Sequence, residues 1–172
     1  MDSHLEKLQR ALHEVIQATP AQMGWHPPGK WCTAEILEHL YLTYTGTIKG
    51  LEKTASKGKP TATRPVFWNR VRTTVVLKFN YLPEGRKSPA RAMPRGLPAE
   101  KVQTEILQKL AEMDEIMTHC EVQFGSGCKL MDHPILGPLN AREWRKFHLV
   151  HGLHHIKQIR KIRQQEKSLL TN

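Results

Sequence analysis

Apolar side chains recur every three or four residues along four segments of the chain, which is the spacing of one face of an α-helix. We therefore predict helices over residues 3–17, 33–54, 98–121 and 140–168. The inward positions would be Leu5, Leu8, Leu12, Val15 and Ile16 in the first; Ile36, Leu37, Leu40, Tyr44 and Ile48 in the second; Val102, Ile106, Leu110, Met113 and Met117 in the third; and Trp144, Phe147, His148, His151, His155, Ile159 and Ile162 in the fourth.

Polar residues mark where these helices begin. Asn140 is followed three residues later by Glu143, a spacing typical of a capping box. The other predicted N-caps are Ser3 and Thr33. Pro98 suits the first turn of the third helix, because the N–H that proline lacks would be unpaired there.

Residues 66–79 form a weaker helical segment, and their run of Val75, Val76 and Leu77 leaves a strand as the alternative. Gly and Pro interrupt the connections 19–30, 55–65, 80–97 and 124–139. Several of these exceed the usual length of a bundle loop, and such loops usually line a site or stay mobile. We expect a single all-α domain over residues 1–172, an antiparallel four-helix bundle with an elaborated middle connection.

The composition, 39% hydrophobic and 24% charged, is that of an ordinary globular protein. The chain has no apolar run of membrane-spanning length, and its first residues lack the apolar core of a signal peptide. We expect a cytoplasmic protein with no membrane partner. The odd number of cysteines argues against a disulfide framework, with Cys120 and Cys128 as less favoured metal ligands.

The net charge is +10, and the basic residues are partly clustered. One group lies on the last predicted helix: Arg142, Arg145, Lys146, Lys157, Arg160, Lys161, Arg163 and Lys167. A second lies in or beside the middle connection: Lys78, Arg86, Lys87, Arg91 and Arg95. A solvated surface is the simplest interpretation, with attraction of anionic small molecules or nucleic acid as alternatives. Nucleic acid is disfavoured because no helix-turn-helix, zinc-finger or RNA-recognition spacing is present.

Four histidines fall within eight residues of the last predicted helix: His148, His151, His154 and His155. Residues four apart share a helix face, so His151 and His155 can offer two imidazoles to one metal ion. His148 lies roughly 10 Å from His155 along the axis, too far to share that ion. His154 is turned away by about 100°. We predict His151 and His155 as ligands and His148 as a supporting contact, with His148/His151 and His151/His154 as the alternative close pairs.

A third ligand must come from another helix, and His39 is the best candidate because it shares the inward face with Ile36 and Leu40. The alternative is a core histidine bonded to a neighbouring acceptor. Glu35 is a candidate to orient a ligand or accept a proton, and Gln158 a candidate to hydrogen-bond one. No side chain is identified as the catalytic group; an ion here could lower the pKa of a bound water or thiol.

Two stretches resemble motifs of the DinB/YfiT-like superfamily. Residues 31–40, Trp-Cys-Thr-Ala-Glu-Ile-Leu-Glu-His-Leu, resemble its second-helix motif, in which a tryptophan precedes a helix bearing one metal histidine. Residues 151–159 resemble its last-helix motif, H-x3-H followed by Arg-Gly-Gln, although this chain has Ile-Lys-Gln at those three positions. Residues 132–139 together with Trp144 are similar to a branch of unknown function.

This resemblance implies a DinB-like bundle in which His39, His151 and His155 bind a divalent ion, often zinc or nickel. Related members include transferases that use bacillithiol, mycothiol or glutathione, and a mycothiol-dependent maleylpyruvate isomerase. We therefore expect a metal-dependent enzyme of the thiol S-transferase or hydrolase type, acting on a small molecule. A metal-stabilised scaffold and a basic nucleic-acid-binding module are the alternatives, and a homodimer is compatible with a bundle of this size.

Overall fold

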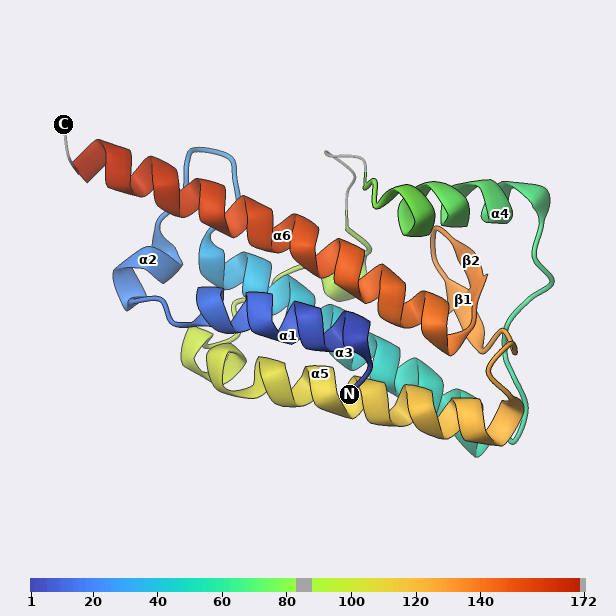
Figure 1. The fold of residues 1–172 in the computed structure, drawn as a ribbon. Coiled ribbons are helices and arrows are strands. Elements are labelled where there is room, and N and C mark those ends of the chain that lie inside the picture. Colours follow the sequence, from blue (N-terminus) through green and yellow to red (C-terminus); the bar gives the residue numbers. More distant parts are fainter. Residues whose placement is uncertain (83–87, 171–172) are drawn as a thin grey trace.

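The computed structural model describes residues 1–82 and 88–170, and four long helices dominate it (Figure 1). These helices are α1 (Ser3–Ile16), α3 (Thr33–Ser56), α5 (Ala99–Phe124) and α6 (Ala141–Leu170). The strands of the described part form one small antiparallel hairpin, β1 (Met131–His133) with β2 (Gly137–Leu139). The all-α prediction is confirmed, and each of the four predicted helices is present.

The predicted cap of the last helix is confirmed, whereas that of the first is displaced by one residue. Asn140 Oδ1 accepts from the Glu143 N–H at 2.9 Å, and the Glu143 carboxylate accepts from the Asn140 N–H at 2.8 Å. Ser3 was the wrong residue for the cap of α1, because Asp2 reaches the His4 N–H at 2.8 Å and Ser3 is already helical. The N-cap of α1 is therefore Asp2, one residue before the predicted Ser3.

The N-caps of α3 and α5 also differ from the prediction by one residue, in opposite directions. Thr33 is not the N-cap of α3; Cys32 is, and the Glu35 carboxylate accepts from the Cys32 N–H at 2.8 Å. Glu35 lies three residues after Cys32, which is the capping-box spacing. Pro98 is likewise the N-cap of α5 rather than part of its first turn.

The four helices form two parallel pairs. In the pair α3/α5, Tyr41 donates to Glu105 at 2.7 Å, and further along both helices Gln123 donates to the backbone oxygen of Ala55. In the pair α1/α6, the contacts advance together from Leu8 beside Gly152 to Arg163 on the backbone oxygen of Val15. Contacts between the pairs run in opposite directions, as between α3 and α6, where His39 meets His151 and Thr47 meets His148.

The expected antiparallel packing therefore holds between α3 and α6 and between α1 and α5, but not within each pair. Two parallel neighbours cannot be joined by a short turn, so the chain must return along the bundle between α3 and α5. Residues 57–98 make this crossover, which accounts for the length of the middle connection.

The crossover contains the predicted fifth helix, so the strand alternative for residues 66–79 is wrong. It forms α4 (Phe67–Thr73), which continues into a π-helical turn, η1 (Thr74–Lys78). A short 3-10 turn, η2 (Ala90–Ala92), follows, whereas Arg86 and Lys87 lie outside the described residues. The first connection also contains a short helix, α2 (Pro20–Gly24).

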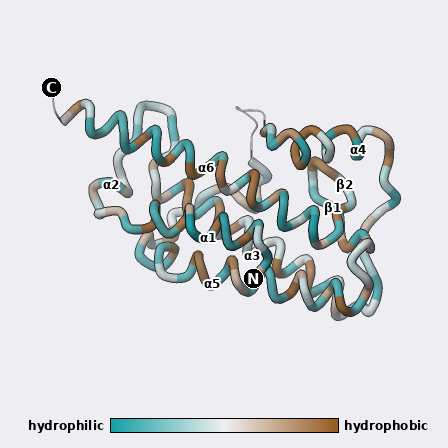
Figure 2. Tube along the Cα trace, in the orientation of Figure 1, coloured by the Kyte–Doolittle hydropathy of each residue, from teal (hydrophilic) through white to brown (hydrophobic). Residues whose placement is uncertain are grey.

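The core lies between the four long helices, where hydrophobic residues alternate with polar ones along each helix (Figure 2). Fully buried side chains include Leu5, Leu8, Leu12, Leu37, Leu40, Tyr44, Leu51, Ile106, Leu110, Met113 and Met117, at the positions the sequence pattern assigns to the interior and beside them. Within residues 1–82 and 88–170, no helix combines the length and apolar composition needed to cross a membrane.

Candidate metal centre

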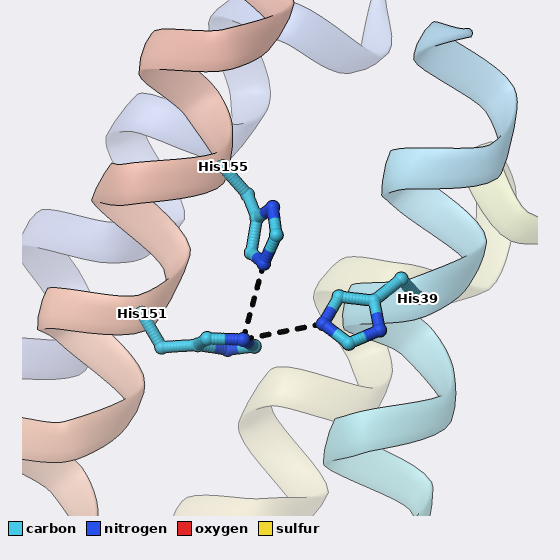
Figure 3. A group of neighbouring side chains, drawn as sticks. All are labelled: His39, His151 and His155. Atoms are coloured by element: carbon cyan, nitrogen blue, oxygen red, sulfur yellow. Dashed lines mark hydrogen bonds between the residues drawn. The ribbon is translucent and has the colours of Figure 1, made fainter. Parts of the chain in front are cut away.

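Three imidazoles from two helices converge in the bundle (Figure 3). His39 comes from α3, and His151 and His155 come from successive turns of α6. The Nε2 atom of His151 lies 3.2 Å from Nε2 of His39 and 3.1 Å from Nε2 of His155. The candidate ligand atoms all lie within 4.8 Å of one another, so these residues could hold a metal ion.

The local sequence explains how α6 is placed for this convergence. Gly152 follows His151 on α6, and a Cβ atom there would overlap the side chain of Leu8 on α1. The missing side chain lets α1 approach the back of α6 closely at the level of the site. On the side of α3, Thr47 contacts Nε2 of His148 at 3.2 Å and helps to set the register of the two helices.

Hydrogen bonds on the far side of two rings fix their tautomers. His39 Nδ1 lies 2.7 Å from the backbone oxygen of Ala92, and His155 Nδ1 lies 2.8 Å from Oε1 of Gln158. Oxygen atoms of this kind accept and do not donate, so each Nδ1 carries the proton. The Nε2 atoms of both rings are therefore bare lone pairs that face His151. Outward N–H donation of this kind is typical of metal-ligating histidines.

Gln158 is oriented by a second contact. Its Nε2 atom lies 3.1 Å from Nε2 of His154, which accepts the amide proton when Oε1 faces His155. His154 thus lies outside the three-histidine group, on the side of the helix that the sequence indicated, and contacts the site through Gln158.

Burial keeps the three imidazoles neutral. It lowers the pKa of His39, an effect that the bond to Ala92 opposes, and lowers the pKa of His155 to about 3. Burial and then the neighbouring His155 and His39 hold the pKa of His151 well below its usual value. Neutral imidazoles are the form that ligates metals.

The geometry of the three facing nitrogens is compatible with a bound cation. With the N–H groups of His39 and His155 directed outward, a neutral cluster has at most one proton, on His151, for three facing nitrogens. Ligand nitrogens of a tetrahedral zinc site lie about 3.3 Å apart, close to the two distances to His151. His151 Nδ1 is buried without a partner among the described residues, and its ring stacks on Phe147 with centroids 5.3 Å apart.

The other residues singled out from the sequence have different positions. Glu35 caps α3 through the Cys32 N–H. His148 is fully buried one turn from His151 and bonds Thr47, outside the three-histidine group. Cys120 is buried near the backbone oxygen of Leu51; neither it nor Cys128 belongs to that group.

Arg145, considered from the sequence as an anion-attracting residue, is buried in the bundle. Its Nε donates to Asp114 at 2.6 Å, and its Nη1 and Nη2 donate to Glu121 and Thr118. This guanidinium joins α6 to α5 and is committed to that role. Arg142, by contrast, is exposed.

Sequence reasoning missed the segment that covers His39. The Glu38 carboxylate accepts from the backbone N–H groups of Arg95 and Gly96, at 2.6 and 3.1 Å. Together with the bond from His39 to Ala92, this ties the end of the crossover to α3. The contacts use backbone atoms of the crossover, which leave no mark in a sequence. The signal available in the sequence was the acidic residue Glu38 directly before His39.

Comparison with known protein families shows which family the chain belongs to. Residues 1–162 match a family described as a protein of unknown function, DUF1569. The chain belongs to the DUF1569 family. A search of curated proteins gave no match, and neither did a search of solved structures. The DUF1569 match covers α1, α3 and α5, extends to residue 162 of α6 and includes the three histidines.

Proposed function

We propose that this DUF1569 protein is a metal-dependent enzyme whose ion, zinc or nickel, is held by His39, His151 and His155. The observation that carries the proposal is the convergence of three Nε2 atoms while two of the rings direct their N–H groups outward. A divalent ion bound by three imidazoles supplies Lewis acidity and lowers the pKa of a thiol or water.

An enzyme fits this donor set better than a scaffold because a structural zinc site usually has four protein ligands. The described residues provide three. The nearest carboxylates in the sequence are committed to the backbone, Glu35 to Cys32 and Glu38 to Arg95 and Gly96. A coordination position is therefore left for a small molecule.

The residues around the histidines would hold the site rigid during turnover. Ala92 and Gln158 fix two of the rings, and Trp31 lies against His39 with ring centroids 5.4 Å apart. We propose a thiol S-transferase or a hydrolase as the reaction type and a small molecule, such as a low-molecular-weight thiol with an electrophilic co-substrate, as the substrate.

Metal analysis is the direct test. Protein purified without chelators should contain about one divalent ion per chain, and His39→Ala, His151→Ala or His155→Ala should each remove it. His13→Ala and His119→Ala are matched controls, since both histidines are exposed and outside the group. A wild-type chain that contains no divalent metal and acquires none on titration contradicts the proposal.

Activity assays then separate the reaction types. The metal-loaded chain is mixed with bacillithiol, mycothiol or glutathione and an electrophile, and separately with ester and amide substrates. Turnover lost in His39→Ala but kept in His119→Ala supports an enzyme. Stoichiometric metal that raises the melting temperature without turnover in any assay supports the scaffold instead.

A further inference from the structure

Nearly all of the net charge lies in the crossover. Residues 57–98 contain ten of the 26 Lys and Arg residues and one of the 16 Asp and Glu residues, so this stretch carries +9 of the chain's +10. Eight of these basic residues are in the described part: Lys57, Lys59, Arg64, Arg70, Arg72, Lys78, Arg91 and Arg95. The rest of the protein is almost neutral.

The same stretch exposes large apolar side chains. Phe67, Trp68 and Phe79 are 71, 64 and 68% exposed. We call the exposed set on and beside α4 the apolar edge; it comprises Val66, Phe67, Trp68, Val75, Phe79 and Tyr81. Among the described residues outside the crossover, exposed large hydrophobics are scattered singly, at Met1, Val122 and Leu169. Exposed apolar patches of this kind mark interaction surfaces.

The helix that bears the apolar edge is attached by polar contacts together with Val76 and Leu77, which pack against the core. Thr73 Oγ1 donates to the backbone oxygen of Leu136 at 3.3 Å, and a Cβ at Gly137 would overlap Asn69. Val76 is the apolar residue of the helix that is buried against the protein. Phe67, Trp68 and Val75 of this helix are exposed. The helix lies at the periphery of the molecule, across the β1–β2 hairpin (Figures 1 and 2).

Three kinds of partner could cover the apolar edge: a second copy of the chain, a single-stranded nucleic acid or an anionic lipid surface. A second copy docked on the same edge would bring two stretches of +9 together, which Coulomb repulsion opposes. Single-stranded nucleic acid needs a groove lined by rings for stacking, whereas this helix projects outward and mixes valines with its aromatics. Aromatic and aliphatic side chains flanked by Arg70, Arg72 and Lys78 match the pattern of a helix that lies in an anionic lipid interface.

We propose that α4 and η1 dock the protein onto an anionic membrane surface, with the apolar edge inserted among the headgroups. The expectation of no membrane partner was based on the absence of a spanning segment, which does not bear on a helix lying in the interface. The inference is independent of the three-histidine site.

Vesicle binding tests the proposal with the full chain. It should co-sediment with vesicles of phosphatidylcholine containing phosphatidylserine, bind phosphatidylcholine alone weakly, and dissociate at high salt. Trp68 is the exposed one of the four tryptophans, so binding should shift its emission to the blue. Trp68→Phe should retain binding and lose that shift.

Matched variants isolate the two contributions. Phe67→Ser with Trp68→Ser should weaken binding to the anionic vesicles roughly tenfold or more, whereas Val122→Ser, an exposed apolar residue on α5, should not change it. Arg70→Glu with Lys78→Glu should also weaken it roughly tenfold or more, whereas Lys157→Glu with Lys161→Glu, the same charge change on exposed positions of α6, should change it far less.

Several results would overturn the proposal. The first is failure of the wild-type chain to bind anionic vesicles at low salt, and the second is a loss of vesicle binding in the control variants equal to that in the test variants. The others are binding to single-stranded nucleic acid, or self-association through the apolar edge, without vesicle binding. Circular dichroism of each variant verifies that it is folded. The lipid and salt dependence of the wild-type chain is decisive even if one variant fails to fold.

Discussion

Replacing His148 should make the metal-free protein more resistant to acid. The imidazole is fully buried, and burial lowers its pKa to about 3, from 6.5 in the solvated state. Below pH 6.5 the His148 imidazole binds a proton in the unfolded chain but stays neutral in the folded chain. The titration of this residue therefore leaves the unfolding free energy unaffected above pH 6.5 and decreases it as the pH falls toward 3.

The magnitude follows from the width of that window. Each pH unit between the two pKa values costs roughly 1.4 kcal/mol of unfolding free energy, so acidification to about pH 4.5 costs about 3 kcal/mol from His148 alone. His148→Leu removes this contribution. At pH 7 we expect His148→Leu to change the unfolding free energy by no more than about 1 kcal/mol. The lost hydrogen bond to Thr47 is offset by removal of the Nδ1 atom, which is buried without a partner among the described residues.

Urea unfolding of the chelator-treated protein at the two pH values measures both quantities. The wild type should lose about 3 kcal/mol more than His148→Leu on acidification. His119→Gln is the matched control, because this histidine is exposed in the folded state. An acid loss in His148→Leu that equals that of the wild type would refute the reasoning.

Three further outcomes are expected. Arg145→Met leaves the buried Asp114 carboxylate without its guanidinium, and it should lower the unfolding free energy in urea melts by about 3–5 kcal/mol. Combining Arg145→Met with Asp114→Leu should recover part of this loss. Gln158→Leu should weaken metal binding about 10–100-fold in competition titrations, whereas Gln164→Leu, exposed on the same helix, should leave it unchanged. Chelation should lower the melting temperature of the wild type but not of His39→Ala.

Local periodicity was sufficient to place the four long helices and the histidines on them. His151 and His155 share a face by helical spacing alone, and the prediction that His39 faces them followed from its inward position. The caps of α1 and α3 were misplaced by one residue, because the Asp2 carboxylate accepts from the His4 N–H and the Glu35 carboxylate accepts from the Cys32 N–H.

Chain direction within the bundle was harder to predict. Apolar stripes show that a helix is buried on one face, but they do not show which neighbour covers it or in which sense it runs. The parallel packing of α3 on α5 depends on pairs such as Tyr41 with Glu105, 64 residues apart. The backbone oxygen of Ala92 that orients His39 could not be predicted either, because every residue carries such an oxygen.

The pairing of α3 with α6 also bears on when the site can form. His39 and His151 are 112 residues apart, and the chain between them contains the crossover and all of α5. Contacts of such long sequence separation form late, after the loop-closure entropy has been overcome. A chain that has folded through α5 but has not yet docked α6 has one of the three imidazoles in place. Metal capture would therefore follow completion of the bundle, and the ion would lock a finished fold rather than nucleate it.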